Sequence, residues 1–233
     1  MKKLVFFLVV VIFVVSAVLG FQAAEKWGAG RSGQAQAFQD IQIASTQKNY
    51  LLVHITDLGS GTPQLVSVWG LMVFYSQPPQ VMLLPLYPSY DDATSAALGT
   101  SFKIDSNGKV SPRFINEIEK RFDLVTTGYI AVDNAGLSLF NKWLTQEEVQ
   151  ISAATPSTAD EKHIVLLNGQ QFFQKACGQF SQQGAKGFTD QIRWMDLIPL
   201  HFSTNLSFES IALASDYFKT AGNISQCAVL SDE

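Results

Sequence analysis

Asp57 stands where an apolar run gives way to a loop, a common place for ligand chemistry in α/β proteins. The run covers residues 49–56, and the loop DLGSGTP that Asp57 begins holds two glycines and a proline. A carboxylate there suits a metal ligand, because Mg²⁺ prefers oxygen ligands. Such an aspartate is at least as typical of a turn, since its side chain hydrogen-bonds the backbone two residues on. The sequence leaves both interpretations of Asp57 open.

A second apolar run, VMLLPLYPSYDD, ends in the carboxylates Asp91 and Asp92, and nothing between Val81 and Tyr90 carries a charge at neutral pH. An adjacent acidic pair in a loop is typical of solvated surface. His54 alternates with apolar residues in the first run and has no identifiable partner. We therefore interpret it as a buried core histidine rather than a catalytic one.

The chain has two cysteines, Cys177 on an apolar helical face and Cys227 near its end. A disulfide between them and a pair of separate buried thiols remain equally open. A catalytic thiol is the least favoured interpretation, because no histidine stands in a recognisable relation to either residue. A disulfide would require an oxidising compartment.

The amino terminus predicts such a compartment. MKK is followed by the uncharged apolar run LVFFLVVVIFVVSAVLGF, which at about 1.5 Å per residue nearly crosses a hydrocarbon core of roughly 30 Å. We predict a membrane anchor at residues 1–21, with Lys2 and Lys3 placing everything after it outside the cytoplasm. Cleavage near Ala23 and Ala24, which would give a secreted protein, is the alternative.

Composition favours a single globular domain at residues 49–233, after a linker at residues 22–48 that is rich in Gly, Ala, Gln and Ser. With 47% hydrophobic and 15% charged residues in 233, the chain can bury a sizeable core. Its formal net charge is −4, whereas nucleic-acid-binding proteins usually carry an excess of basic residues. We therefore expect no nucleic-acid partner.

Apolar runs and turn signals predict an α/β fold. Near-continuous apolar strands at residues 49–56, 64–76 and 80–86 indicate a central sheet that is covered on both faces. A fourth strand is expected at residues 124–132. Strands and helices then mix without strict alternation, so we predict a three-layer α/β/α domain with a central mixed sheet.

The helices are predicted from capping residues and apolar spacing. Ser111 and Pro112 mark the start of one helix, and Asp133 caps the next. Residues 146–161 are predicted to be a polar loop around one short strand near residues 149–151. Three further helices are expected, one that begins at Asn168, one at residues 189–197 and one at residues 207–220.

The order of these segments resembles the LytR-CpsA-Psr family, the cell envelope-related transcriptional attenuators. NYLLVHITD is similar to the family's opening strand, which ends in Gly-Val-Asp, so Asp57 matches its first acidic position. FINEIEKRFDLVTTGYIAVDNAGLSLFNKWL is similar to a family helix followed by Ile-Asp-Tyr-Tyr-Val-x-Val-Asp. LNGQQFFQKA resembles Leu-x-Gly-x-x-Ala-Leu-x-Tyr, and TDQIRWMDLI stands where the family has Arg-x-x-Arg-Gln-Gln. The resemblance spans about residues 49–198.

Members of this family transfer a polymer from a polyprenyl-pyrophosphate carrier to the cell wall or a similar acceptor. The resemblance therefore implies arginines around a pyrophosphate, carboxylates that hold Mg²⁺, and a long apolar cleft for the lipid. It makes Asp57 the candidate metal ligand and Arg193 and Lys175 the candidate phosphate-binding residues. Core packing is the alternative for the aromatic residues that are candidates for the cleft, which are Trp69, Phe74, Tyr87, Phe172 and Phe173.

The polar motifs of the family are largely absent from this chain. PLYPS stands where the family has Ser-Ile-Pro-Arg-Asp, SVWG replaces Arg-Ser-Asp-Thr, and KACGQ replaces Tyr-x-Arg-x-Arg. Asp190 replaces the first arginine of the late helix, which leaves Arg193 at a spacing that also suits a simple ion pair with Asp190. No arginine occurs between Arg31 and Arg113.

These losses predict a divergent, non-catalytic relative of the family that works outside the cytoplasm without a cofactor. It would bind a polyprenyl lipid, a cell-wall glycan or an envelope partner through the inherited cleft. The alternative is an active Mg²⁺-dependent phosphotransferase with relocated cations, drawn from Lys103, Lys175 and Arg193. The missing arginines favour the first hypothesis, because each charged hydrogen bond to a pyrophosphate contributes about 1.5–3 kcal/mol.

Overall fold

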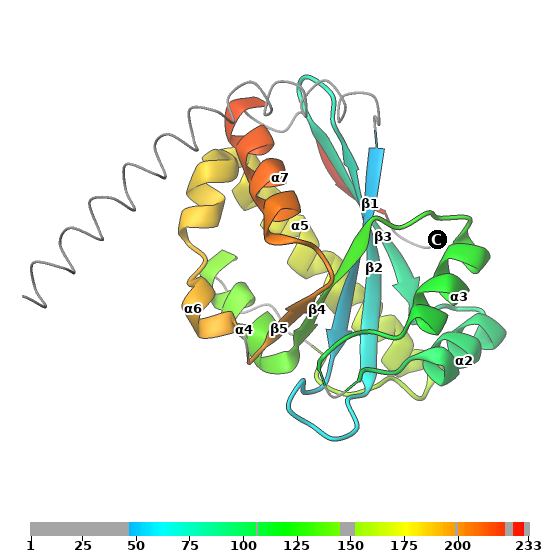
Figure 1. Ribbon diagram of the computed structural model, residues 1–233. Helices are drawn as coiled ribbons and strands as arrows, with labels where there is room; N and C mark the ends of the chain where they lie inside the picture. Colours follow the sequence, from blue (N-terminus) through cyan, green and yellow to red (C-terminus); the bar gives the residue numbers. More distant parts are fainter. Residues whose placement is uncertain (1–46, 106, 145–151, 199, 222–225, 231–233) are drawn as a thin grey trace, which may run out of the picture. The chain divides into compact units, whose positions relative to one another are not determined.

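A six-stranded mixed sheet organises the protein, as a computed structural model shows (Figure 1). The structure describes residues 47–105, 107–144, 152–198, 200–221 and 226–230. The strand order is β5-β4-β1-β2-β3-β6. The predicted anchor, most of the predicted linker and the short strand expected near residues 149–151 lie outside the described residues. No helix in the described ranges has the length and apolar character needed to cross a bilayer.

The three strands at the centre of the prediction are confirmed. They are β1 (Gln47–Ile55), β2 (Leu65–Phe74) and β3 (Gln80–Tyr87), each antiparallel to the next. The fourth strand, β4 (Gly128–Asp133), pairs in parallel with β1. It begins four residues later than predicted because Thr126 donates its backbone N–H and its hydroxyl to Glu119 Oε1, which holds residues 124–127 as a connection.

Two short edge strands complete the sheet, and the sequence did not predict either of them. β5 (Phe202–Thr204) pairs antiparallel with β4, and β6 (Gln226–Val229) pairs in parallel with β3. Strands of three and four residues have too little alternation to stand out in a sequence. Parallel and antiparallel pairs thus occur together, which confirms a mixed α/β domain.

One face of the sheet is covered by α2 (Asp92–Ser101) and α3 (Pro112–Phe122) (Figure 1). Ser111 caps α3 as predicted, since its side chain accepts the backbone N–H of Phe114. Helix α2 is a correction, because this segment was interpreted as a loop with an acidic pair. Asp91 is the N-cap of α2, and its hydrogen bonds from Thr94 and Ala93 lower the pKa of its carboxyl.

The main core lies between this face and the two helices. Alternate residues of β1 supply its floor, namely Leu51, Val53 and Ile55, each at most 2% exposed. Leu98 of α2 and Phe114 of α3 are fully buried against them. This face is therefore closed by packed side chains, and any cleft for a ligand has to lie on the other face.

The other face is covered by α4 (Asn134–Leu144), α5 (Ala159–Asp190), α6 (Trp194–Leu197) and α7 (Phe208–Ala221) (Figure 1). Helix α5 begins nine residues before Asn168, which corrects the prediction of a loop through Glu161. Thr158 and Glu161 form a reciprocal cap, since Thr158 Oγ1 accepts the Glu161 N–H and Glu161 Oε2 accepts the Thr158 N–H. This Thr-x-x-Glu signal was present in the sequence.

The helix predicted at residues 189–197 is confirmed only in its last four residues. Helix α5 continues to Asp190, with an internal kink at Gly184 where φ is 68°, and α6 is a separate turn of four residues. The left-handed conformation at this kink is one that glycine adopts without strain. The helix predicted at residues 207–220 is confirmed as α7, and Ser207 caps it by accepting the N–H of Ser210.

Candidate functional site

A large apolar cleft lies between the sheet and helices α4 to α7, with a volume of about 1170 Å³. Its floor is made by the side chains of β1 to β4 that alternate with the core residues. On β2 these are Ser67, Trp69, Leu71 and Val73, while Leu83 of β3 lies beside them. Because strand side chains point alternately to the two faces, one set of strands serves both the packed core and the cleft.

The helices supply an equally apolar roof, listed here by helix: Leu137 and Phe140 of α4; Phe172, Phe173, Ala176 and Phe180 of α5; Trp194 of α6; Phe208, Ile211, Ala212 and Phe218 of α7. Among the described lining residues, Asp216 and Lys219 of α7 are the two whose side chains are charged at neutral pH. The cleft therefore suits a long apolar ligand better than a polyanion.

Trp69 is the largest side chain of the floor and meets α5 at Gly169. A Cβ on Gly169 would lie 2.8 Å from Trp69 Cζ2, so this close approach requires glycine. The Trp69 ring also packs at 5.0 Å from the ring of Phe173. The buried indole Nε1 of Trp69 hydrogen-bonds to no described group.

His54 is a polar group in the floor. It is 8% exposed, and its Nε2 lies 2.8 Å from Asn134 Oδ1. Burial lowers the pKa of His54 to about 4, while the hydrogen bond to Asn134 and the charge of Asp133 oppose this shift. The imidazole is therefore neutral at pH 7, in keeping with a core histidine, and contributes no positive charge to the cleft.

Asp133 lies beside this histidine at the end of β4 and is 2% exposed. Its Oδ1 accepts the N–H of Gly136 at 2.8 Å, the capping role that the sequence predicted. Its Oδ2 lies 3.0 Å from His201 Nδ1. No sequence pattern pointed to the contact with His201, because 68 residues separate the pair. The carboxylate is held by structural contacts rather than directed into the cleft.

The five aromatic cleft candidates divide between the two faces. Trp69, Phe172 and Phe173 line the cleft, whereas Phe74 is not among the lining residues and Tyr87 packs in the main core. The register of β2 and β3 slips between Val68 and Trp69, so Tyr87 pairs with Val68 of the core face. This irregularity reverses the alternation of side chains at the end of β3.

The three polar candidates do not line the cleft. Asp57 Oδ1 accepts the N–H of Gly59 at 2.8 Å, which is the turn interpretation of this residue. Arg193 is 71% exposed, and its Nε pairs with Asp196 Oδ2 at 3.1 Å. Lys175 lies on α5, outside the set of lining residues.

A magnesium ion does not fit the residues around Asp57. Its side chain is engaged in a turn, and within the described ranges no three His, Cys, Asp or Glu side chains gather as metal ligands would. Mg²⁺ needs several oxygen ligands in near-octahedral geometry. We therefore derive no catalytic step through a metal at this position.

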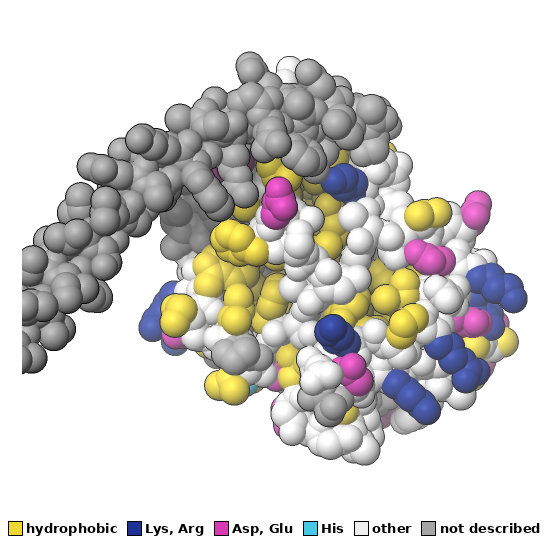
Figure 2. Space-filling model, viewed as in Figure 1, with side chains coloured by type: hydrophobic (Ala, Val, Ile, Leu, Met, Phe, Trp, Pro, Cys, Tyr) yellow, Lys and Arg dark blue, Asp and Glu magenta, His cyan; other side chains and the backbone are white. Residues whose placement is uncertain are grey.

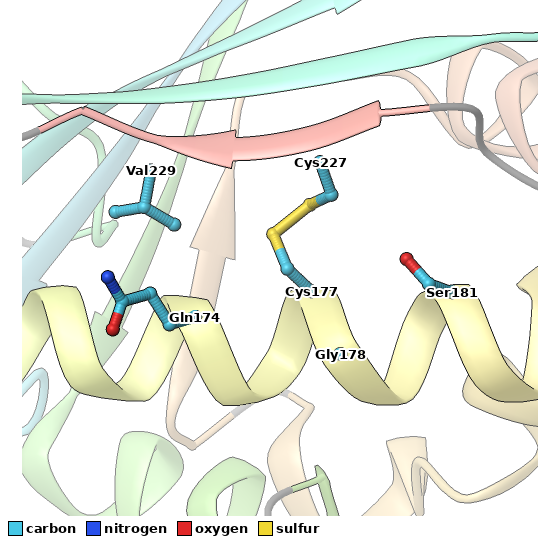
Figure 3. A pocket seen from close by; sticks show the side chains of 6 residues that line it. All are labelled: Gln174, Cys177, Gly178, Ser181, Cys227 and Val229. Carbon is cyan, nitrogen blue, oxygen red and sulfur yellow. A yellow bond between two sulfur atoms is a disulfide. The ribbon is translucent and has the colours of Figure 1, made fainter.

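A disulfide closes one border of the cleft. Cys177 of α5 is bonded to Cys227 of β6 (Figure 3), and both residues are among those that line the cleft. A smaller pocket lies around the bond and is lined also by Gln174, Gly178, Ser181 and Val229 (Figure 3). The bond ties the short edge strand to the longest helix, which is one of the two outcomes that the sequence left open.

No protein-family model matches the chain, and no curated protein sequence matches it. Similar solved structures include TagT bound to LIIa-WTA, with 10% identity and a TM-score of 0.47 over 81% of this chain and 79% of that chain. Protein gbs0355 from Streptococcus agalactiae is 11% identical, with a TM-score of 0.48 over 81% of this chain and 78% of that chain. TagV from B. subtilis is 10% identical, with a TM-score of 0.43 over 80% of this chain and 85% of that chain.

TagT and TagV belong to the LytR-CpsA-Psr family. With TM-scores below 0.5 and about a tenth of the residues identical, these likenesses do not assign this chain to a family or give it an activity.

Proposed function

We propose that this protein binds a long apolar lipid chain of the polyprenyl type in the cleft, as a non-catalytic cell-envelope protein related to the LytR-CpsA-Psr family. The observation that carries the proposal is the cleft itself, with its aromatic and aliphatic lining. Its volume of about 1170 Å³ lies above the range of about 300–1,000 Å³ that is typical of small-molecule sites. A long chain uses such a volume better than a compact metabolite does.

The lining also favours a lipid over a glycan. Each methylene group that leaves water for an apolar wall contributes about 0.8 kcal/mol, so a long hydrocarbon chain gains affinity along its whole length. A glycan would have to give up hydrogen bonds to water, and the polar side chains of the described lining are a minority among its apolar ones: His54, Ser67, Ser152, Asn168, Ser215, Asp216 and Lys219. Glycan binding is therefore the less favoured form of the proposal.

The arrangement of charges supports a non-catalytic role. Transfer from a pyrophosphate requires several cations that converge on one point. The described lining contributes one lysine, Lys219, while Arg193 points its charge to solvent and to Asp196. The transferase alternative would need a set of cations that these residues do not form.

An oxidising compartment belongs to the proposal. The bonded pair Cys177 and Cys227 is typical of proteins that fold outside the cytoplasm. The apolar leader at residues 1–21 supports the same location, as an anchor or as a cleaved signal.

Cross-linking to a lipid probe tests the proposal. The full chain in lipid nanodiscs would be exposed to a photoreactive long-chain polyprenyl phosphate, and cross-linked peptides would be identified by mass spectrometry. Ala212→Trp fills the cleft, whereas Ala214→Trp lies on the same helix and outside the lining, which makes it the matched control. We expect cleft peptides to be labelled in the wild type and in Ala214→Trp, and labelling to fall about tenfold in Ala212→Trp, as for a loss of about 1.4 kcal/mol.

Equal labelling of Ala212→Trp and Ala214→Trp would contradict the proposal, and so would labelling confined to other peptides. A soluble cell-wall oligosaccharide that protects the cleft from labelling, in place of an unlabelled lipid, would support the glycan form instead.

A further inference from the structure

Large apolar side chains are exposed mainly in one part of the chain. Of the eleven large hydrophobic residues that are exposed within the described ranges, six lie in residues 194–211: Trp194, Met195, Ile198, Leu200, Phe208 and Ile211. Met195, Phe208 and Leu200 are 89%, 86% and 70% exposed. Figure 2 shows hydrophobic side chains gathered over the part of this face where α6 and α7 lie in Figure 1. We call these six residues the apolar lip.

The apolar lip is continuous with the cleft. Trp194, Ile198, Phe208 and Ile211 are exposed to solvent and also line the cleft. The lip therefore borders the cleft, and these four side chains form an apolar surface that leads from solvent to the interior, beside the exposed charged lining residues Asp216 and Lys219 of α7. Large exposed apolar patches of this kind mark protein–protein or membrane interaction sites.

We propose that the apolar lip inserts into the surface of a lipid bilayer, so that the cleft opens directly to the membrane. Trp194 has the amphipathic ring that is typical of the membrane interface, and Met195, Leu200 and Phe208 supply side chains for insertion. The proposal deepens the proposed function, since it gives a lipid a path that avoids water. Docking itself rests on the exposed side chains and does not require an occupied cleft.

The chain outside the described residues favours a bilayer over a second copy of the protein. The predicted anchor ends at Phe21, and the 25 residues from Gln22 to Thr46 precede β1. At about 3.3–3.6 Å per residue they reach at most about 90 Å, so the domain stays within range of the membrane that holds the anchor. A surface held this close to a bilayer meets lipid at high effective concentration.

Charge gives the proposal a distinct signature. Residues 193–211 carry Arg193, Asp196 and Glu209, and Arg193 is paired with Asp196. The lip has no cluster of lysines or arginines that would attract anionic headgroups. Insertion is therefore driven by apolar burial, and it should depend little on salt or on anionic lipid.

The test places a probe on the lip of the full chain in vesicles of zwitterionic phospholipid. Met195→Cys would be labelled with an environment-sensitive fluorophore under non-reducing conditions, and lipid-attached quenchers would report contact with the bilayer. Val125→Cys is the matched control, because Val125 is 81% exposed and lies between α3 and β4. We expect strong quenching at position 195, little at position 125, and no change on raising the salt from 0.05 to about 0.5 M.

Leu200→Asp with Phe208→Asp should reduce quenching at position 195 at least about fivefold, as charged groups insert poorly. Ala212→Trp should leave this quenching intact while it reduces lipid cross-linking about tenfold, which separates failure of docking from failure of cleft binding. Equal quenching at both positions, or none at position 195, would overturn the proposal. If the emission of the probe at position 195 shifts without quenching, and two copies of the chain cross-link to each other, the lip binds a second protomer and the bilayer proposal is wrong.

Discussion

His54 is the buried ionisable residue in the floor of the cleft. Its pKa is lowered to about 4 in the folded protein, whereas the ordinary value, expected in the unfolded chain, is 6.5. Between these values the unfolded chain binds a proton at this position and the folded chain does not, so folding stability rises with pH in this window. The stabilisation is complete above about pH 6.5, and it is lost progressively as the pH falls from there to about 4.

We predict that acidification from pH 7 to pH 4 costs the wild type about 3 kcal/mol more than His54→Gln, whose amide keeps a donor for Asn134 Oδ1. Urea denaturation of both proteins across this range measures the difference. Comparing the two variants cancels the contribution of the carboxylates that they share. Parallel pH curves would show that burial does not suppress the charge on His54.

Gly169 decides how closely α5 approaches Trp69. We predict that Gly169→Ala lowers the free energy of unfolding by about 1–3 kcal/mol, because the added Cβ overlaps a rigid ring at 2.8 Å. Gly178→Ala is the matched control on the same helix, since its Cβ meets nothing within 4 Å. The control should be neutral or stabilising by about 0.5–1 kcal/mol. Chemical denaturation that ranks the two variants equally would contradict the packing argument.

At the scale of elements, β6 depends on the bond to α5. It has four residues and one sheet neighbour, β3, and the backbone N–H of Leu230 after it donates to Leu83 O at 2.8 Å. Cys177 and Cys227 are 50 residues apart. In the chain-entropy model, a disulfide that closes a loop of that size restricts the unfolded chain and so stabilises the folded protein by about 4 kcal/mol. The disulfide therefore adds a second constraint on the edge strand beside its ladder.

Replacing both cysteines should thus lower the free energy of unfolding by about 2–4 kcal/mol and speed hydrogen exchange at Ala228 and Leu230 before other strands. The Ala/Ala and Ser/Ser double variants separate loss of the bond from burial of two hydroxyl groups. Unchanged stability and unchanged exchange in Ala/Ala would mean that the ladder alone secures β6.

At the scale of the whole molecule, the two faces of the sheet have different roles. The face under α2 and α3 is filled by a packed core, while the face under α4 to α7 encloses the cleft. The polar candidates of the sequence are outside that cleft. A lipid can therefore be held without the groups that would act on its headgroup.

We predict no measurable Mg²⁺-dependent cleavage of a polyprenyl pyrophosphate by the purified full chain. One carboxylate engaged in a turn holds Mg²⁺ weakly, and one arginine paired with Asp196 does not neutralise a pyrophosphate. Release of phosphate from a labelled polyprenyl pyrophosphate measures this. Turnover that disappears in Asp57→Ala or Arg193→Ala would restore the transferase hypothesis, and turnover insensitive to both would mean that other residues carry the chemistry.

The sequence by itself determined the features that depend on neighbouring residues. Apolar runs gave β1, β2 and β3, and the caps Ser111 and Asp133 gave the starts of α3 and α4. These signals are local, because a strand's alternation and a cap's hydrogen bond involve residues that lie close in the chain. The start of α5 was equally readable from Thr158 and Glu161.

Only the tertiary structure decided what depends on contacts between distant segments. β5 and β6 are strands because β4 and β3 pair with them, and Tyr87 faces the core because the pairing of β2 and β3 slips by one residue. The cleft exists because helices α4 to α7 lie over one face of the sheet without filling the space between. No local sequence pattern determines the distance between these helices and the sheet. Its lip is apolar in the sequence, but its exposure follows from the absence, among the described residues, of an element packed over it.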